Sequence, residues 1–238
     1  MIARRIIAVL LAVAMAAFLV ANVWPLSDQA DGPVRVSERF LDRGLQETGA
    51  VNIVSAVLLD YRGFDTLGET VVILATALAV GALLGQGRRP PTGRGLSVLV
   101  RRSIAFLAPL FWLMPAYIVV NGHLSPGGGF QGGVGWATLL VLLAVVYGSG
   151  APRRLWPPNT LQKIEYAAAL CFLGLGLYGL IRVGAFLSNR AAGFSMGIPG
   201  TLPSAGVIPW LNLAIGVKVM AGLAAIFFYM QRDEELAS

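Results

Sequence analysis

The sequence predicts an all-α, polytopic integral membrane protein with about six transmembrane helices and with its N and C termini in the cytoplasm. Only 13% of the 238 residues are charged and 56% are hydrophobic, whereas a soluble domain averages about 25% charged residues. Several apolar runs also reach the ~20 residues that a helix needs to cross a bilayer. The predicted spans are 6–24, 68–85, 104–121, 130–148, 165–187 and 208–230.

The distribution of Arg and Lys among the loops predicts the topology. Eleven of these residues lie in segments on one side of the predicted bundle, including Arg88, Arg89, Arg153 and Arg154, and five lie on the other side. The positive-inside rule therefore places both termini in the cytoplasm. The formal net charge of +6 then reflects topology, and we expect no nucleic-acid partner, because no soluble domain carries a basic face.

The first apolar run follows Arg4 and Arg5, as the apolar core of a signal peptide would. It is long for such a core, and no clear cleavage site with small residues follows it before Asn22. We therefore expect 6–24 to be a retained signal-anchor helix.

The chain has one cysteine and one histidine, Cys171 and His123. One cysteine permits no internal disulfide and no iron–sulfur ligation, and one histidine permits no bis-histidine haem. We expect no cofactor, no tightly bound metal and no enzymatic activity of the chain alone. Cys171 is expected to be a small core residue.

Two predicted units are joined by a basic linker. Residues 1–85 form a two-helix unit, 86–103 a cytoplasmic linker rich in Arg, Pro and Gly, and 104–238 a four-helix domain. Within the first unit, residues 36–47 alternate charged and apolar positions, which predicts a short surface helix. The apolar run 51–59 is too short to span, so it should lie at the outer surface or against other protein.

Four ionisable residues are predicted at membrane depth, where charge is costly and function is the default interpretation. They are Glu69, Glu165, Arg182 and Lys218. Lys218 lies about eleven residues into the last span, roughly 16 Å along a helix that rises 1.5 Å per residue. Two interpretations stay open: a proton relay, or a structural ion pair with an acid of another chain.

Asp60, Asp65 and Glu69 form an acidic cluster at the start of the second span. Asp65 and Glu69 are four residues apart and share a helix face, so one interpretation is the entrance of a cation or proton path. The alternative is capping: Thr66 would be the N-cap of the helix, and Glu69 would reach back to the backbone N–H of Thr66. Both interpretations can hold together.

The glycine-rich stretch Asn121–Trp136, which we call the elbow, separates two apolar runs. A phosphate cradle is disfavoured, because no P-loop lysine and no preceding strand accompany the glycines. We expect Ser125 to cap the next helix and Pro126 to occupy its first turn, while Gly127, Gly128 and Gly129 permit close helix packing. His123 is either a satisfied interfacial histidine or part of a proton path.

Three motifs resemble one family closely. "DYRGFDTLGE" looks like the last transmembrane piece of the large MrpA protein of Mrp-type Na⁺/H⁺ antiporters, and equally like the MbhE protein of membrane-bound hydrogenases. "GHLSPGGGFQGG" and "GTLPSAGVIPWLNLAIGVKVMAGL" look like MrpB, the MnhB domain, which is called MbhF in the hydrogenase. The resemblance covers nearly the whole chain, which therefore resembles a fusion of the two pieces.

The resemblance implies a non-catalytic, multi-pass subunit of a multisubunit Na⁺/H⁺ antiport module in the inner (plasma) membrane of a prokaryotic cell. Its partners would be large antiporter-like subunits and small three-helix subunits, with Na⁺ and H⁺ as the ions. Acids matching Asp60 and Glu69 are implicated in the family's cation path, with transient Na⁺ binding, and Asp65 supports them. Roles for Lys218 and His123 in such a path are inferred from their position alone.

Three alternatives remain. The same module can belong to a redox-driven complex, such as a membrane-bound hydrogenase or a complex I-like pump. The chain can be a purely structural assembly subunit. A self-sufficient transporter is disfavoured, because the sequence has no internal repeat.

Overall fold

The computed structural model describes residues 13, 36–84, 95–148, 152 and 155–230, and this part of the chain is helical with no strand. Five of its helices are long and apolar enough to cross a membrane. The all-α, multi-pass class is thus confirmed. Apart from Val13, the span predicted at 6–24 lies outside the described residues. The orientation of the termini stays a prediction.

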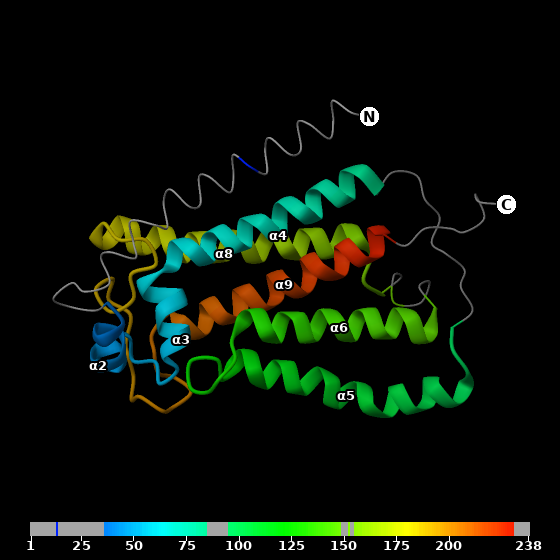
Figure 1. Cartoon of the computed structure of the whole chain (residues 1–238), viewed down its shortest axis with the longest axis horizontal. Helices are drawn as coiled ribbons and strands as arrows, with labels where there is room; N and C mark the ends of the chain where they lie inside the picture. The colour runs from blue at the N-terminus through cyan, green and yellow to red at the C-terminus, as the bar shows by residue number, and fades with distance from the viewer. Residues whose placement is uncertain (1–12, 14–35, 85–94, 149–151, 153–154, 231–238) are drawn as a thin grey trace. The chain divides into compact units, whose positions relative to one another are not determined.

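The chain divides into two compact units, Met1–Asp42 and Arg43–Ser238, and the long helices belong to the second. These helices run side by side along one direction (Figure 1). In chain order they are α4 (Gly63–Leu84), α5 (Val98–Val120), α6 (Gly129–Tyr147), α8 (Pro158–Val183) and α9 (Ile208–Met230).

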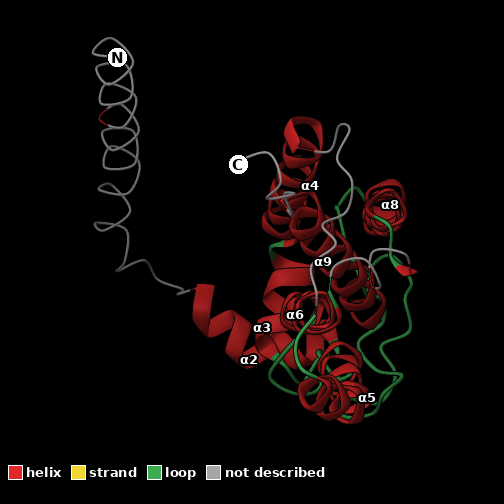
Figure 2. Cartoon of the chain, turned by 90° about the vertical axis from the view of Figure 1, so that its right-hand side faces the viewer, coloured by secondary structure: helices red, strands yellow, loops and turns green. Residues whose placement is uncertain are grey.

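Helix α9 is the core of this bundle. It packs against α4, α6 and α8, while α5 packs mainly on α6, as the end-on view shows (Figure 2). Two thirds of the most apolar stretch of α9 is buried, against about a tenth for α4 and α5 (67% and 11%). Helices α4 and α5 therefore present most of their surface to lipid or to other chains.

Small residues allow α6 to lie close to α9. A Cβ atom added to Gly133 would stand 2.7 Å from the carbonyl oxygen of Gly216, and one added to Gly129 would overlap the carbonyl oxygen of Asn212. Without a hydrophobic driving force between helices in lipid, such close backbone approach is a main source of packing energy.

Several helices begin earlier than the apolar pattern predicts. Helix α5 begins at Val98 instead of 104, and α8 begins at Pro158 instead of 165. Hydropathy marks the hydrocarbon-crossing part, but the backbone ladder continues into polar residues at the interface. Helix α8 also ends at Val183, four residues early, because Gly184 adopts a left-handed conformation (φ 75°) and its N–H bonds to Leu180 O.

The short elements that precede α4 in the chain agree with the sequence. The predicted surface helix is α2 (Val36–Thr48), and the run that is too short to span forms α3 (Ile53–Ala56) and one π-helical segment (Val57–Tyr61). Ala56 and Leu59 are buried in the core, so this segment does pack against protein. Cys171, expected in the core, is instead exposed on α8. Its side chain lines an open groove between α8 and α9, opposite Trp210 and Val217.

Candidate functional site

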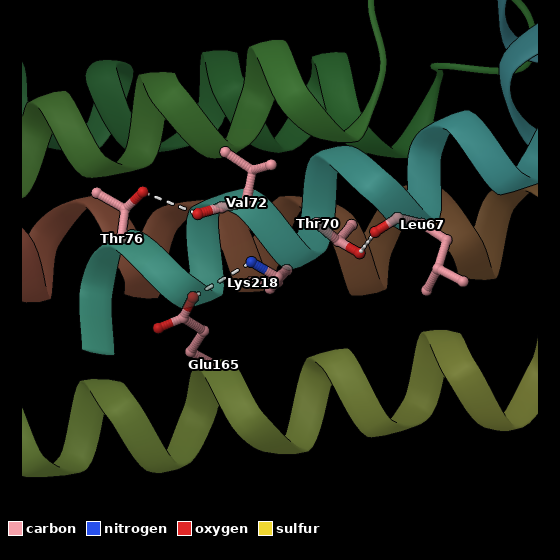
Figure 3. A network of polar contacts seen from close by, with 6 residues as sticks. All are labelled: Leu67, Thr70, Val72, Thr76, Glu165 and Lys218. Atoms are coloured by element: carbon pink, nitrogen blue, oxygen red, sulfur yellow. Dashed lines mark hydrogen bonds and ion pairs between the residues drawn. The ribbon is translucent and has the colours of Figure 1, made fainter. Parts of the chain in front are cut away.

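A buried ion pair joins α8 to α9. Lys218 Nζ lies 3.2 Å from Glu165 Oε1, and the two side chains are 1% and 0% exposed. The two side chains point toward one another (Figure 3). Lys218 lies about 15 Å along α9 from the helix end beside the elbow, at 1.5 Å per residue. In a hydrocarbon core of about 30 Å, the pair is therefore close to the midplane.

Gly222 provides the space for the carboxylate. A Cβ atom at this position would stand 2.7 Å from Glu165 Oε1 and 3.1 Å from Ile73 Cγ2 of α4. Three helices, α4, α8 and α9, thus meet around the pair and exclude lipid from it.

The sequence left open an ion pair between Lys218 and an acid of another chain, and the structure shows a different partner. The acid belongs to the same chain, and Glu165 was recognised there only as a separate ionisable residue. A signal was present: two opposite charges lie at similar depth in two apolar runs that are consecutive in the chain, and consecutive helices often pack together. Sequence spacing alone, 53 residues, does not reveal this contact.

Asp60 occupies a second polar cluster, near the elbow. It lies on the π-helical segment, and burial raises the pKa of its carboxyl to about 6. Hydrogen bonds from the backbone and side chain of Asn189 lower this pKa, and the nearby charge of Glu47 raises it. Tyr61 Oη donates to Glu47 Oε2 at 2.5 Å. Two carboxylates thus lie near one another at this end of the bundle.

Asn189 was missed in the sequence, although it holds this end together. Its Nδ2 donates to Ala205 O at 3.0 Å and to Thr48 O at 3.4 Å, and its Oδ1 accepts from Val207 N–H at 3.0 Å. The residue is buried. Its sequence context, a polar loop, resembles that of any exposed asparagine, so no pattern identifies it.

Asp65 and Glu69 are exposed on α4, whereas Asp60 is half-buried on the π-helical segment. Asp65 forms an ion pair with Arg62 on the surface. The capping-box interpretation is wrong, because α4 begins at Gly63 and Thr66 lies inside the helix. Thr66 Oγ1 instead donates to Leu58 O at 2.7 Å. This bond ties α4 to the π-helical segment.

His123 is fully buried beneath the loop that precedes α9. Its Nε2 lies 3.1 Å from Leu202 O, and its carbonyl accepts from Asn52 N–H at 3.0 Å. Its Nδ1 has no partner in the described part of the chain, and burial lowers the pKa of the imidazole. The ring therefore lies in the protein interior, and its predicted place at the level of the membrane interface stays a prediction.

The prediction that Ser125 caps α6 and that Pro126 occupies its first turn is wrong. The helix begins at Gly129, so Ser125 and Pro126 precede it, and Ser125 Oγ bonds to Asn121 O instead. The cap comes from α9: Gly129 N–H donates to Asn212 Oδ1 at 2.9 Å. Gly127 and Gly128 have positive φ angles (141° and 147°), which glycine adopts without strain. These two residues turn the chain into α6.

A small cavity with polar and apolar walls adjoins this cap. It has a volume of about 30 Å³ and is lined partly by Ser55, Thr66, Gln131 and Asn212. Asn212 Nδ2 is buried with no acceptor among the described residues. A cavity of this size can hold a water molecule, and such waters satisfy buried polar groups of this kind.

Replacing Asn212 by leucine is expected to destabilise the protein by about 1–3 kcal/mol, the cost of leaving a buried donor such as Gly129 N–H without its partner. Asn212→Asp keeps the acceptor oxygen, so it should be more stable than the leucine variant. This advantage should be larger at low pH, where the new carboxyl is neutral. The thermal midpoint of the purified protein in detergent measures both. A leucine variant as stable as the wild type would contradict the capping role.

Replacing Asp60 by asparagine is expected to raise the thermal midpoint at pH 8. The pKa of Asp60 in the folded protein is about 6, above its usual 3.8, so stability falls as the pH rises from about 4 to about 6. Asparagine removes the buried charge, and the difference from the wild type should vanish near pH 4. Asp65→Asn, at an exposed position, controls for the loss of one acidic charge. An equal gain in that variant would count against burial as the cause.

Comparison with known proteins identifies the family. A model described as a domain related to the MnhB subunit of Na⁺/H⁺ antiporters matches residues 99–225, more than half of the chain. The chain belongs to the MnhB family. A second model, that of the MbhE subunit of MBH, matches residues 3–99. The two matches meet within the predicted linker 86–103, although the domain division itself stays a prediction.

Two relatives show how this MnhB-family chain compares in length with other proteins. A protein of Methanocaldococcus jannaschii is 34% identical over 208 residues, which cover 77% of this chain and 78% of the relative. A probable K⁺/H⁺ antiporter protein of Rhizobium meliloti, described as its A/B subunit, is 28% identical over 81% of this chain. The chain spans only 22% of that antiporter protein.

Two solved structures share the fold. One is a chain of the membrane-bound sulfane sulfur reductase, an archaeal respiratory membrane complex, with a TM-score of 0.71, 32% identity and coverage of 94% of this chain and 98% of that one. The other belongs to the Mrp complex of Dietzia, with a TM-score of 0.65 and 25% identity. This match covers 94% of the present chain and 26% of the Dietzia chain. Both neighbours belong to multisubunit membrane complexes.

Proposed function

We propose that this chain is a non-catalytic integral subunit of a multisubunit Mrp-type module that exchanges a cation for protons. In this module it contributes to an ion path and to assembly. The observation that carries the proposal is the buried Glu165–Lys218 pair inside a membrane bundle of the MnhB family. Charges in the middle of a membrane protein are costly, and they commonly mark ion or proton pathways.

Stability alone explains the pair poorly. Replacing a buried ion pair with apolar residues of similar volume is often neutral or stabilising, because desolvation of both charges offsets their attraction. A purely structural subunit could therefore place two leucines here at little cost. This argument favours the ion-path role over the assembly-only alternative.

The acids near the elbow supply an entrance in this proposal. Asp60 is half-buried and lies close to Glu47, whereas Asp65 and Glu69 lie on the exposed part of α4. An exposed carboxylate on a helix that faces lipid or a partner suits an interface between subunits. Transient Na⁺ at Asp60 and Glu69, and a proton role for His123, are parts of the proposal.

A second candidate is the same module inside a redox-driven complex. The likeness to one chain of the archaeal respiratory complex favours it, because that match has higher identity and TM-score (32% and 0.71) than the match to the Mrp complex (25% and 0.65). In both cases the partners are other membrane subunits, and any redox cofactor would belong to them.

Co-purification tests the proposal. A tag on this chain, mild detergent and mass spectrometry identify the subunits that accompany it. Antiporter-like subunits alone would support an exchanger, and the same subunits with iron–sulfur polypeptides would support the redox-driven complex. A chain that emerges alone from several mild detergents would contradict both.

A further inference from the structure

The ion pair in the bundle is asymmetric. Lys218 contacts only one oxygen of Glu165, and the other oxygen, Oε2, is buried with no hydrogen-bond partner in the described part of the chain. A carboxylate has about four acceptor positions on its two oxygens. A buried acceptor oxygen without a hydrogen bond lowers the stability of the folded protein. Glu165 Oε2 is therefore available to a ligand that the described chain does not supply.

The residues around Oε2 offer it no alternative donor. Thr70 and Thr76 of α4 appear in the same view (Figure 3), but their hydroxyl groups donate to Leu67 O and Val72 O at 2.8 Å. Gly222 of α9 has no side chain, and Ile73 of α4 is apolar. The site therefore contains one carboxylate, one ammonium and an apolar wall.

Few other charged groups are close enough to act on this carboxylate. On the described helices that pack around it, only Lys218 faces it. Lys163 of α8 and Glu69 of α4 are exposed on the outer surface of the bundle. Tyr229 of α9 donates to Asn159 Oδ1 at 3.5 Å. The charge state of Glu165 thus depends mainly on Lys218.

We propose that Glu165 Oε2 is a proton-binding site inside the membrane and that Lys218 is the internal cation released when the proton binds. The step is balanced. One O–H bond forms at Oε2, the attraction between Lys218 Nζ and Oε1 weakens, and Lys218 keeps its three protons. The charge of the site changes from zero to +1, and loss of the proton restores the pair.

This change gives the site a role in exchange, an inference that rests on the proposed function. A site with charge +1 at low dielectric repels a nearby cation strongly. Arrival of a proton at Glu165 would therefore drive a cation out of a neighbouring part of the path. A fixed ion pair without proton exchange could not couple the two movements.

A hydrophobic carbodiimide tests the site within the complete complex. This reagent reacts with a protonated carboxyl group in an apolar environment: the carboxyl proton moves to a carbodiimide nitrogen and the oxygen bonds to the central carbon. Mass spectrometry of the tagged chain locates the adduct. We expect labelling of Glu165 that falls as the pH rises, and no adduct at this position in Glu165→Gln.

Two variants at position 218 test the part played by the lysine. Lys218→Met removes the counter-cation, so the carboxyl should stay protonated and labelling should rise several-fold and lose its pH dependence. Lys218→Arg keeps a permanent cation, so labelling should remain at or below the wild-type level. If the methionine variant folds poorly, the arginine variant and the wild-type pH series still test the proposal.

The outcomes separate this inference from the proposed function. Absence of labelling at Glu165 across the pH range, with other carboxyl groups labelled, would overturn the inference. Labelling that is identical in Lys218→Arg, Lys218→Met and the wild type would also overturn it. Neither result would change which subunits co-purify, and the co-purification result would not change the labelling.

Discussion

Lys218→Met alone is expected to destabilise the protein by about 3–5 kcal/mol at pH 8, because Glu165 without its counter-charge must take up a proton to remain buried. The free energy of unfolding or the thermal midpoint of the purified complex measures this. The loss should shrink at low pH, where the carboxyl is neutral. A single variant as stable as the wild type at pH 8 would mean that water already reaches the site.

The double variant Glu165→Leu/Lys218→Met separates the effect of the pair on stability from its effect on ion exchange. It replaces both charges with apolar side chains of similar volume, so stability should return to about the wild-type level. Ion exchange should stay lost, because no group remains to carry the charge. A double variant that restores both stability and exchange would assign the pair to packing alone.

The second large effect is expected at the contact between α6 and α9. Gly133→Leu should destabilise the bundle by about 3 kcal/mol or more through overpacking, since even a Cβ atom there would stand 2.7 Å from Gly216 O and from Val219 Cβ. The thermal midpoint and the yield of assembled complex measure the effect.

Gly174→Leu is the matched control for that substitution. Nothing lies within 4 Å of a Cβ atom at Gly174 of α8, so the same change of side chain should shift stability by no more than about 0.5 kcal/mol. Equal losses in the two variants would show that the leucine acts through the helix backbone or the lipid, and would contradict the role given to close packing.

Much of the fold could be predicted because bilayer thickness imposes a length on each apolar run. The five spans, the short segment 51–59 and the helix at 36–47 follow from hydropathy and charge alternation. Helix starts were less predictable, since α5 and α8 continue into polar residues that hydropathy excludes. The ends of helices depend on local backbone geometry, as Gly184 illustrates.

The site was predicted only in part, for a physical reason. Lys218 was identified because a charge in an apolar run is costly at any position, whichever residue pairs with it. The roles of three other residues depend on which helices and loops meet in the folded protein, and local sequence does not show those contacts. These residues are Glu165, which pairs with Lys218, Asn212, which caps α6, and Asn189, which bonds to Thr48, Ala205 and Val207. The expected caps at Thr66 and Ser125 were wrong because tertiary contacts replaced the local ones.

The central claim is that an ion path runs through this chain at Glu165. Reconstituting the purified complex with Glu165→Gln into liposomes, and measuring cation-dependent proton movement against the wild type, tests it most directly. The account predicts that exchange is lost while every subunit still co-purifies. Wild-type exchange by an intact Glu165→Gln complex would contradict it and leave this chain with a role in assembly alone.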